Sequence, residues 1–124
     1  MADTEGKKIK IAQVIGNAKV GGVINCVMNY FRNIDTSKVQ FDFYTYGPSP
    51  FDEEIKARGG RVFYFPSVFA FFKCVRFLRK SFKRERYDIV HAHMTSLSFV
   101  SLLAAKKAGV KHRICHAHST TNKE

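Results

Sequence analysis

The sequence predicts an α/β fold: a Rossmann-like, doubly wound parallel sheet with an approximate strand order of 3-2-1-4-5. Three observations lead to this prediction. Short β-type runs alternate with amphipathic runs of helix length, the connections between them are short, and glycine or proline ends most of the runs. Because strand–helix–strand alternation requires parallel strands with right-handed crossovers, a single layered sheet accounts for the pattern.

The first part of the chain predicts a strand, a helix and a second strand. Residues 8–16 alternate polar and apolar side chains and then become apolar, which is typical of a strand that enters a core. Residues 23–34 carry apolar side chains at helical offsets, with Tyr30 in the apolar stripe. Residues 39–46 alternate cleanly and stop at a Gly-Pro pair, so they predict the second strand.

The middle of the chain predicts a short helix, a strand and the longest helix. Residues 51–58 form the short helix, which the glycines at 59–60 end because glycine adopts a left-handed C-cap at little cost. Residues 61–65 are rich in β-type side chains and close at a proline. Residues 68–86 predict the longest helix, with Phe72 in its apolar stripe.

The last part predicts a strand at residues 88–93, a helix at 96–108 ended by glycine, and a fifth strand at 111–116. No helix-length run follows the fifth strand, although a parallel strand normally needs cover on both faces. We therefore expect residues 1–7 to be an N-terminal tail and residues 8–124 to be the first part of a larger Rossmann-like domain.

Composition and charge exclude several classes of protein. The 124 residues are 45% hydrophobic with 8 glycines and 3 prolines, which excludes low-complexity, collagen-like and disordered chains. Lysine and arginine number 21 against 10 acidic residues, which gives a net charge of +11. A balance this basic favours anionic partners, among them nucleic acid, anionic lipid and phosphorylated ligands.

The cysteines and the N-terminus predict a cytoplasmic location, with the membrane surface still open as a place of action. Cys26, Cys74 and Cys115 stand far apart and form no CxxC pair, so no disulfide framework is expected. No apolar run approaches the roughly 20 residues of a membrane-spanning helix. The N-terminus also lacks the long apolar stretch and cleavage site of a signal peptide.

The expected carboxyl edge of the sheet collects the polar residues best able to carry chemistry. Ligands of open parallel sheets bind at this edge, near the switch in strand order. Four of the 5 histidines arrive there. The residues brought to this edge are Asn17, Gly21, Gly22, His91, His93, Thr95, His116, His118 and Ser119.

Gly21 and Gly22 precede the first expected helix, where unpaired N–H groups and the helix dipole favour an anion such as a phosphate. The alternative is that the pair only permits a tight turn and close helix packing. The loop is not a G-x-G-x-x-G fingerprint, because Gly16 and Gly21 are too far apart. It is not a Walker loop either, because no Lys-Ser/Thr follows the glycines. Both interpretations stay open on the sequence.

His91 and His93 are two residues apart on an expected strand, so both rings face one side of the sheet. A metal site is disfavoured, because no carboxylate accompanies them and structural zinc sites use tighter Cys/His spacings. For His93, at the open end of the strand, we favour an acid–base or sugar-contacting role. For His91, within the strand, we favour a hydrogen-bonded core histidine.

Residues 73–86 predict a basic amphipathic helix, with seven basic residues against one acid and an apolar stripe on the opposite side. The basic face is either a solvated surface or a surface that adsorbs to anionic lipid. Nucleic-acid binding is disfavoured, because no RNA-binding aromatic motif, zinc finger or helix-turn-helix spacing is present. The basic residues are Lys73, Arg76, Arg79, Lys80, Lys83, Arg84 and Arg86.

Three stretches resemble the N-terminal domain of GT-B glycosyltransferases, in particular the retaining family 4 enzymes of bacterial capsular or exopolysaccharide synthesis. They are IAQVIGNAKVGGVINCVMNYFRNI, YDIVHAHMTSLSFVSLLAAKKAGV and KHRICHAHST. The resemblance covers about residues 8–120. It depends on a combination: a glycine pair in the first loop, a D-I-V-H-x-H fourth strand and an H-x-H-S fifth strand.

The resemblance implies two Rossmann-like domains that face each other across a cleft. The N-terminal domain mainly binds the acceptor, and the C-terminal domain holds a nucleotide-sugar donor, usually linked to uridine or guanosine diphosphate. The nucleotide sugar is a co-substrate, so no cofactor and no metal ion are implied. The basic helix at residues 73–86 corresponds to helices of the family that contact the membrane in which a lipid-linked acceptor is held.

The same resemblance implies roles for single residues. Gly21 and Gly22 correspond to the loop beside the donor's diphosphate, and His93 corresponds to the histidine that approaches the reacting sugar. The residues assigned to the acceptor side are Asn17, Thr95, His118 and Ser119.

The chain departs from the family pattern by ending just after the fifth strand. The donor domain is absent with its E-x7-E motif, since Glu53, Glu54 and Glu85 form no such pair. We therefore expect this chain alone to have no transferase activity. At family level the predicted function is transfer of a sugar from a nucleotide-diphosphate sugar to a polysaccharide or lipid-linked acceptor. The alternative is a stand-alone basic module that binds an anionic membrane or a partner chain.

Overall fold

A computed structural model describes residues 8–16, 22–67, 70–93 and 98–115. Five parallel strands form one sheet in the order β3-β2-β1-β4-β5, which confirms the predicted fold class and strand order. The strands are β1 (Ile9–Gly16), β2 (Val39–Thr45), β3 (Arg61–Tyr64), β4 (Ile89–Ala92) and β5 (His112–Cys115). The helices are α2 (Gly22–Asn33), α3 (Asp52–Ala57), α4 (Phe71–Glu85) and α5 (Ser98–Ala108).

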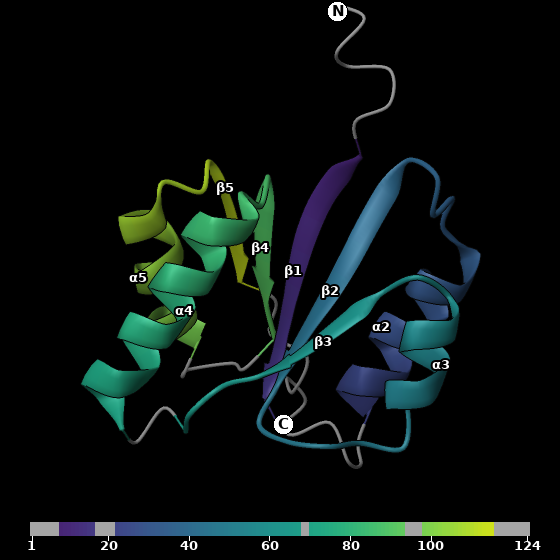
Figure 1. Ribbon diagram of the computed structural model, residues 1–124, viewed down its shortest axis with the longest axis horizontal. Coiled ribbons are helices and arrows are strands. Elements are labelled where there is room, and N and C mark those ends of the chain that lie inside the picture. The colour runs from purple at the N-terminus through teal and green to yellow at the C-terminus, as the bar shows by residue number, and fades with distance from the viewer. Residues whose placement is uncertain (1–7, 17–21, 68–69, 94–97, 116–124) are drawn as a thin grey trace, which may run out of the picture.

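The sheet lies between two pairs of helices, with α2 and α3 on one side and α4 and α5 on the other (Figure 1). Alternate residues of β1 face opposite layers, because side chains alternate along a strand. Val14 belongs to the apolar cluster under α4 and α5, and Ile15 belongs to the cluster under α2 and α3. β1 is therefore covered on both faces.

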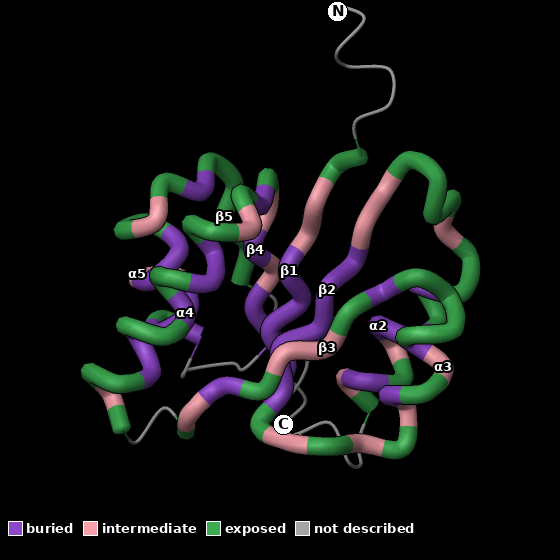
Figure 2. The backbone as a smooth tube through the Cα atoms, in the orientation of Figure 1, coloured by how far each residue is buried: buried purple, intermediate pink, exposed green. Residues whose placement is uncertain are grey.

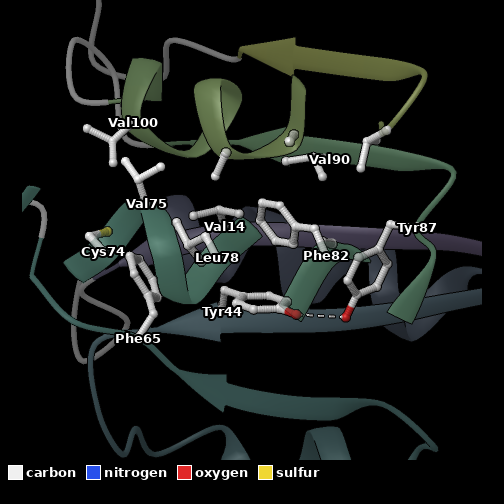
Figure 3. Close-up of a cluster of buried hydrophobic side chains, with 14 residues drawn as sticks. Val14, Tyr44, Phe65, Cys74, Val75, Leu78, Phe82, Tyr87, Val90 and Val100 are labelled. Carbon is white, nitrogen blue, oxygen red and sulfur yellow. Dashed lines mark hydrogen bonds between the residues drawn. The ribbon is translucent and has the colours of Figure 1, made fainter. Parts of the chain in front are cut away.

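The long helix α4 supplies one side of the larger cluster. Val75, Leu78 and Phe82 point from α4 toward Val14 and Val90 of the sheet (Figure 3). Their spacing of three and four residues places them on one face of the helix. This packing fixes α4 across β1 and β4, and leaves its other face to solvent.

Burial is uneven along the two longest strands. The last five residues of β1 and of β2 are buried, whereas the first residues of both are half-buried or exposed (Figure 2). β5 is exposed at all four of its residues, although it pairs with β4 along its length. The buried part of the sheet is therefore the carboxyl-terminal half of its long strands β1 and β2. This is where the candidate site was expected.

The predicted element boundaries agree with the structure to within one residue at most ends. Gly59 and Gly109 have φ values of 94° and 85°, so glycine ends α3 and α5 in the left-handed region as expected. Arg86 ends α4 in the same region with a φ of 56°. It lies just outside the helix that was expected to include it.

Two residues expected in apolar stripes are exposed instead. Phe72 is 82% exposed and Tyr30 is 61% exposed, so their assignment to the core was wrong. Successive helical residues differ by about 100° in direction, so the core covers only one arc of each helix, and Phe72 and Tyr30 fall outside that arc. In α4 the buried face begins at Cys74, and in α2 Phe31 is buried in place of its neighbour.

Candidate functional site

His91 and His93 share one face of the sheet, as predicted from their spacing. Their ring centroids are 4.0 Å apart, with an angle of 41° between the ring planes. Val90, which alternates with them, faces α4 and α5. The two imidazoles therefore lie on the side of the sheet that carries α2.

The burial of the two rings is the reverse of what we expected, which was a core position for His91 and an open one for His93. His93 is 4% exposed, whereas His91 is half-buried. His91 pairs in register with Ile114 of β5, which is 45% exposed, so this part of the sheet face is open. His93 follows β4 and is anchored to β1, because its backbone N–H donates to the Val14 carbonyl at 2.9 Å.

Gln13 of β1 contacts the ring of His93, and the sequence reasoning missed it. Gln13 Oε1 lies 2.7 Å from His93 Nε2, and Gln13 is also 4% exposed. An amide oxygen only accepts hydrogen bonds, so Nε2 is the nitrogen that carries the hydrogen. The available signal was a lone polar residue among the buried Ala12, Val14 and Ile15.

Gly22 is the first residue of α2 and is exposed. Among the described residues, nothing lies within 4 Å of the position that a Cβ atom would occupy there. Its backbone is also outside the left-handed region. At Gly22 itself, therefore, neither a close contact among the described residues nor a left-handed backbone requires glycine.

Several predicted site residues lie outside the described part of the chain. For these residues the roles given above stay predictions. They are Asn17, Gly21, Thr95, His116, His118 and Ser119.

The seven basic residues predicted on the long helix are all exposed. The buried side of α4 consists of Cys74, Val75, Leu78, Ser81 and Phe82, so the predicted amphipathic character is confirmed. Phe72 and Phe99 add exposed aromatic surface at the N-terminal ends of α4 and α5, at 82% and 56% exposure. Phe71 lies between them, 5.3 Å from Phe72 and 6.3 Å from Phe99 by ring centroids.

A second buried polar cluster surrounds Asp42 of β2, which is fully buried. Its carboxylate accepts hydrogen bonds from Tyr87 Oη at 2.6 Å and from Arg61 Nη2 at 2.7 Å. Gln40 Nε2 donates to the other oxygen at 2.8 Å. Tyr44 Oη lies 3.1 Å from Tyr87 Oη, which extends the network into the apolar cluster (Figure 3).

Ionisation in this second cluster follows its burial and its ion pairs. Burial raises the pKa of Tyr44 to about 12, and burial together with Tyr44 and Asp42 raises the pKa of Tyr87 above its usual value. Burial alone would raise the pKa of Glu85, but hydrogen bonds from Arg61 and other cations lower it to about 2. Both tyrosines therefore stay neutral and Glu85 stays ionised near neutral pH.

A groove lies at the opposite edge of the sheet. It has a volume of about 1050 Å³ and is lined by residues that precede or begin the strands, among them Ile9, Asp88 and His112. Its rim is basic, with Lys8, Lys38, Lys83, Arg86 and Lys111. It is therefore separate from the site around His93, which lies at the carboxyl ends of β1 and β4.

Two further properties concern only the described residues. Within residues 8–16, 22–67, 70–93 and 98–115, no group of three or more His, Cys, Asp or Glu side chains could hold a metal ion. Of the helices in those ranges, none has the length and apolar character needed to cross a membrane.

Comparison with known proteins identifies the domain. The model of Glycosyltransferase Family 4 matches residues 20–123. EpsF of Bacillus subtilis (strain 168), which is named as a glycosyltransferase, is 41% identical to this chain over 117 residues. The match covers 90% of this chain and 30% of EpsF.

Two solved structures share the fold. A glycosyltransferase from Rickettsia africae ESF-5 superposes with a TM-score of 0.71 at 18% identity, over 88% of this chain and 29% of its own. MurG of Acinetobacter baumannii superposes with a TM-score of 0.66 at 12% identity, over 87% of this chain and 34% of its own. This chain thus spans about a third of the length of the proteins it matches. With most of its residues matched by the family model, the chain belongs to glycosyltransferase family 4.

Proposed function

We propose that this chain is the acceptor-side domain of a retaining glycosyltransferase. The reaction transfers a sugar from a nucleotide-diphosphate sugar to a polysaccharide or lipid-linked acceptor at the cytoplasmic face of the membrane. The observation that carries the proposal is His93, held by Gln13 at the carboxyl ends of β4 and β1 in a family 4 domain. This is the edge at which open parallel sheets bind ligands.

In this proposal His93 contacts the reacting sugar and exchanges a proton or a hydrogen bond with it. The N-terminus of α2 faces the donor's diphosphate, because Gly22 leaves its backbone open and the helix dipole favours an anion. Gly21 takes part in the same contact, and Asn17, Thr95, His118 and Ser119 line the acceptor side. The nucleotide sugar is a co-substrate, and the reaction requires no metal ion.

The donor is held mainly by a second domain outside this chain. This part of the proposal is supported by the coverage of EpsF, of which only 30% is matched. We therefore expect the isolated chain to show no transfer from radiolabelled UDP- or GDP-sugars to host membranes. We expect the native product of the gene, identified by intact mass spectrometry, to show transfer under the same conditions.

The test of the site is His93→Ala in the native gene product. Loss of an acid–base group reduces turnover by about 10² to 10⁴-fold. The matched control is His112→Ala, which removes the same side chain from an exposed position on β5 and should leave turnover unchanged. Thermal unfolding of both variants checks that the fold is intact. Unchanged turnover in a folded His93→Ala protein would contradict the proposed role.

A second property, contact with anionic membranes, is supported by α4. It carries six exposed basic residues, Arg86 follows at its end, and the exposed rings of Phe72 and Phe99 lie at the N-terminal ends of α4 and α5. Basic side chains near an anionic bilayer contribute about 1 kcal/mol each, and exposed aromatic rings suit the interface. The same surface would serve the alternative, a stand-alone module that docks on a membrane.

Co-sedimentation with liposomes tests this contact. Arg79→Gln/Lys80→Gln removes two exposed charges of α4 and should weaken binding to anionic vesicles by roughly 30-fold, from about 2 kcal/mol. Lys106→Gln/Lys107→Gln removes two exposed charges from the end of α5 and is the matched control. Binding should also fall with salt. Equal loss in the two double variants, or binding indifferent to lipid charge, would argue against α4 as the contact.

A further inference from the structure

We infer that Gln13 is a positioning residue for His93: it fixes the tautomer and the orientation of the imidazole that acts on the sugar. The inference rests on the proposed function, because His93 must itself contact the substrate. Gln13 acts through His93 and is not proposed to contact the substrate.

The geometry of β1 supports this role. β1 holds His93 at two points: the Gln13 side chain accepts from the ring at 2.7 Å, and the Val14 carbonyl accepts from the backbone N–H at 2.9 Å. Gln13 also pairs in register with His91, so the register between β1 and β4 fixes its position beside the two rings. The contact joins residues 80 positions apart in the chain, through adjacent parallel strands.

The energetics of burial separate this role from ordinary packing. Gln13 is buried on the same face of β1 as Ile11 and Ile15, where an apolar side chain would avoid the cost of burying an amide. A buried donor without an acceptor costs about 1–3 kcal/mol, so a buried His93 needs a partner such as the Gln13 oxygen. The amide is therefore explained by the histidine and not by the apolar layer around it.

The consequence for chemistry is a defined tautomer. An acceptor at Nε2 keeps the hydrogen on that nitrogen, which leaves the lone pair on Nδ1. Nδ1 is then the ring nitrogen able to take up a proton or accept a hydrogen bond. Without Gln13 the ring could adopt the other tautomer or rotate, and a misplaced catalytic group loses about 10²-fold in rate.

The experiment compares Gln13→Leu with Gln13→Glu in the native gene product, using radiolabelled UDP- and GDP-sugars and host membranes. Gln13→Leu removes the acceptor at similar volume and should lower kcat by about 10²-fold with KM changed much less. Gln13→Glu keeps an acceptor and should restore a large part of kcat. The matched control is Gln40→Leu, which removes an amide of β2 that bonds to Asp42 and should leave kcat unchanged.

Long-range ¹H–¹⁵N spectra of protein labelled at histidine nitrogen give a second readout. The unsubstituted protein and Gln13→Glu should show His93 with its hydrogen on Nε2, and Gln13→Leu should lose that preference. Hydrogen on Nδ1 in the unsubstituted protein would overturn the inference, even if Gln13→Leu does not fold.

The His93→Ala background separates this inference from the proposed function. Gln13→Leu should add no further loss of kcat there, because residues that act through one another are not additive. If His93→Ala leaves turnover intact, the proposed function fails. If His93→Ala abolishes turnover but Gln13→Leu keeps both kcat and the tautomer, only the role of Gln13 is overturned.

Discussion

The two buried polar clusters of this domain, around Asp42 and around His93, are similar in burial but different in chemistry. Asp42 lies at the centre of β2, and its oxygens accept hydrogen bonds from Arg61, Tyr87 and Gln40. His93 follows the last residue of β4, and both its ring and its backbone N–H are bonded to oxygens of β1. Tyr44, two residues after Asp42, lies in the cluster under α4 and α5, so the two polar clusters occupy opposite faces of the sheet.

This difference distinguishes stability from function. The buried carboxylate of Asp42 already accepts hydrogen bonds from several side chains, so it has no capacity left to bind a ligand. Removing it leaves its donor groups without this compensating partner. An imidazole at a strand end lies where loops and ligands meet. We therefore expect variants of the Asp42 cluster to change unfolding and variants of the His93 cluster to change turnover.

Asp42→Ala is expected to have the largest effect on stability. It removes the buried acceptor that Tyr87 and Arg61 share, and leaves Arg61 paired with Glu85 at the margin, so the free energy of unfolding should fall by about 3–5 kcal/mol. Denaturant unfolding of the native gene product measures the loss. Glu53→Ala, at an exposed acid of α3, is the control and should change stability by about 0.5 kcal/mol or less. An Asp42→Ala protein that is as stable as the parent but loses turnover would contradict the assignment of the Asp42 cluster to stability.

Tyr87→Phe is expected to have an intermediate effect. It removes one charged hydrogen bond to Asp42 and the contact with Tyr44, while Arg61 still neutralises the carboxylate. Hydrogen bonds to charged groups contribute about 1.5–3 kcal/mol, and the same unfolding experiment should show a loss in that range. Tyr30→Phe is the control, because that hydroxyl is on a ring that is 61% exposed. A loss no larger than that of the control would mean that Arg61 alone holds Asp42.

The sequence predicted the fold and the shared face of the two histidines because both depend on local periodicity. A period of two places His91 and His93 on one side of a strand, and glycines mark the ends of helices. The same reasoning misplaced Phe72, whose direction on α4 falls outside the arc of residues that face the core.

What the sequence did not predict depends on register between strands. The contact of Gln13 with His93 and the pairing of Asp42 with Arg61 join residues 80 and 19 positions apart. Parallel register decides which side chains become neighbours across strands, and periodicity within one strand carries no information on it. The burial of His93 follows from the adjacent β1, so exposure at a strand end could not be inferred from β4 alone.

Acid titration should give the smallest change in stability. It should also show that the pH dependence of stability arises in the Asp42 cluster. The pKa of Glu85 is lowered to about 2 by Arg61 and other cations despite its partial burial. A lowered pKa in the folded state contributes stability that is complete above the ordinary value of about 4.5 and is lost as the pH falls toward 2. Glu85→Gln should therefore lower Tm slightly at pH 7. The decrease of Tm between pH 4.5 and pH 2 should then be smaller than in the parent.

The matched control for the titration is Glu53→Gln, an exposed acid that should keep the full acid dependence of the parent. Salt should reduce the contribution of Glu85 only in part, since its side chain is 14% exposed and pairs with both Lys10 and Arg61. If Glu85→Gln leaves the acid limb unchanged, the ion pairs at the margin of the cluster contribute nothing measurable, and the stabilising charge is Asp42 alone. The difference between the two clusters would then be one between the carboxylate of Asp42, which stabilises one face of the sheet, and the imidazole of His93 on the opposite face, for which we propose a role in turnover.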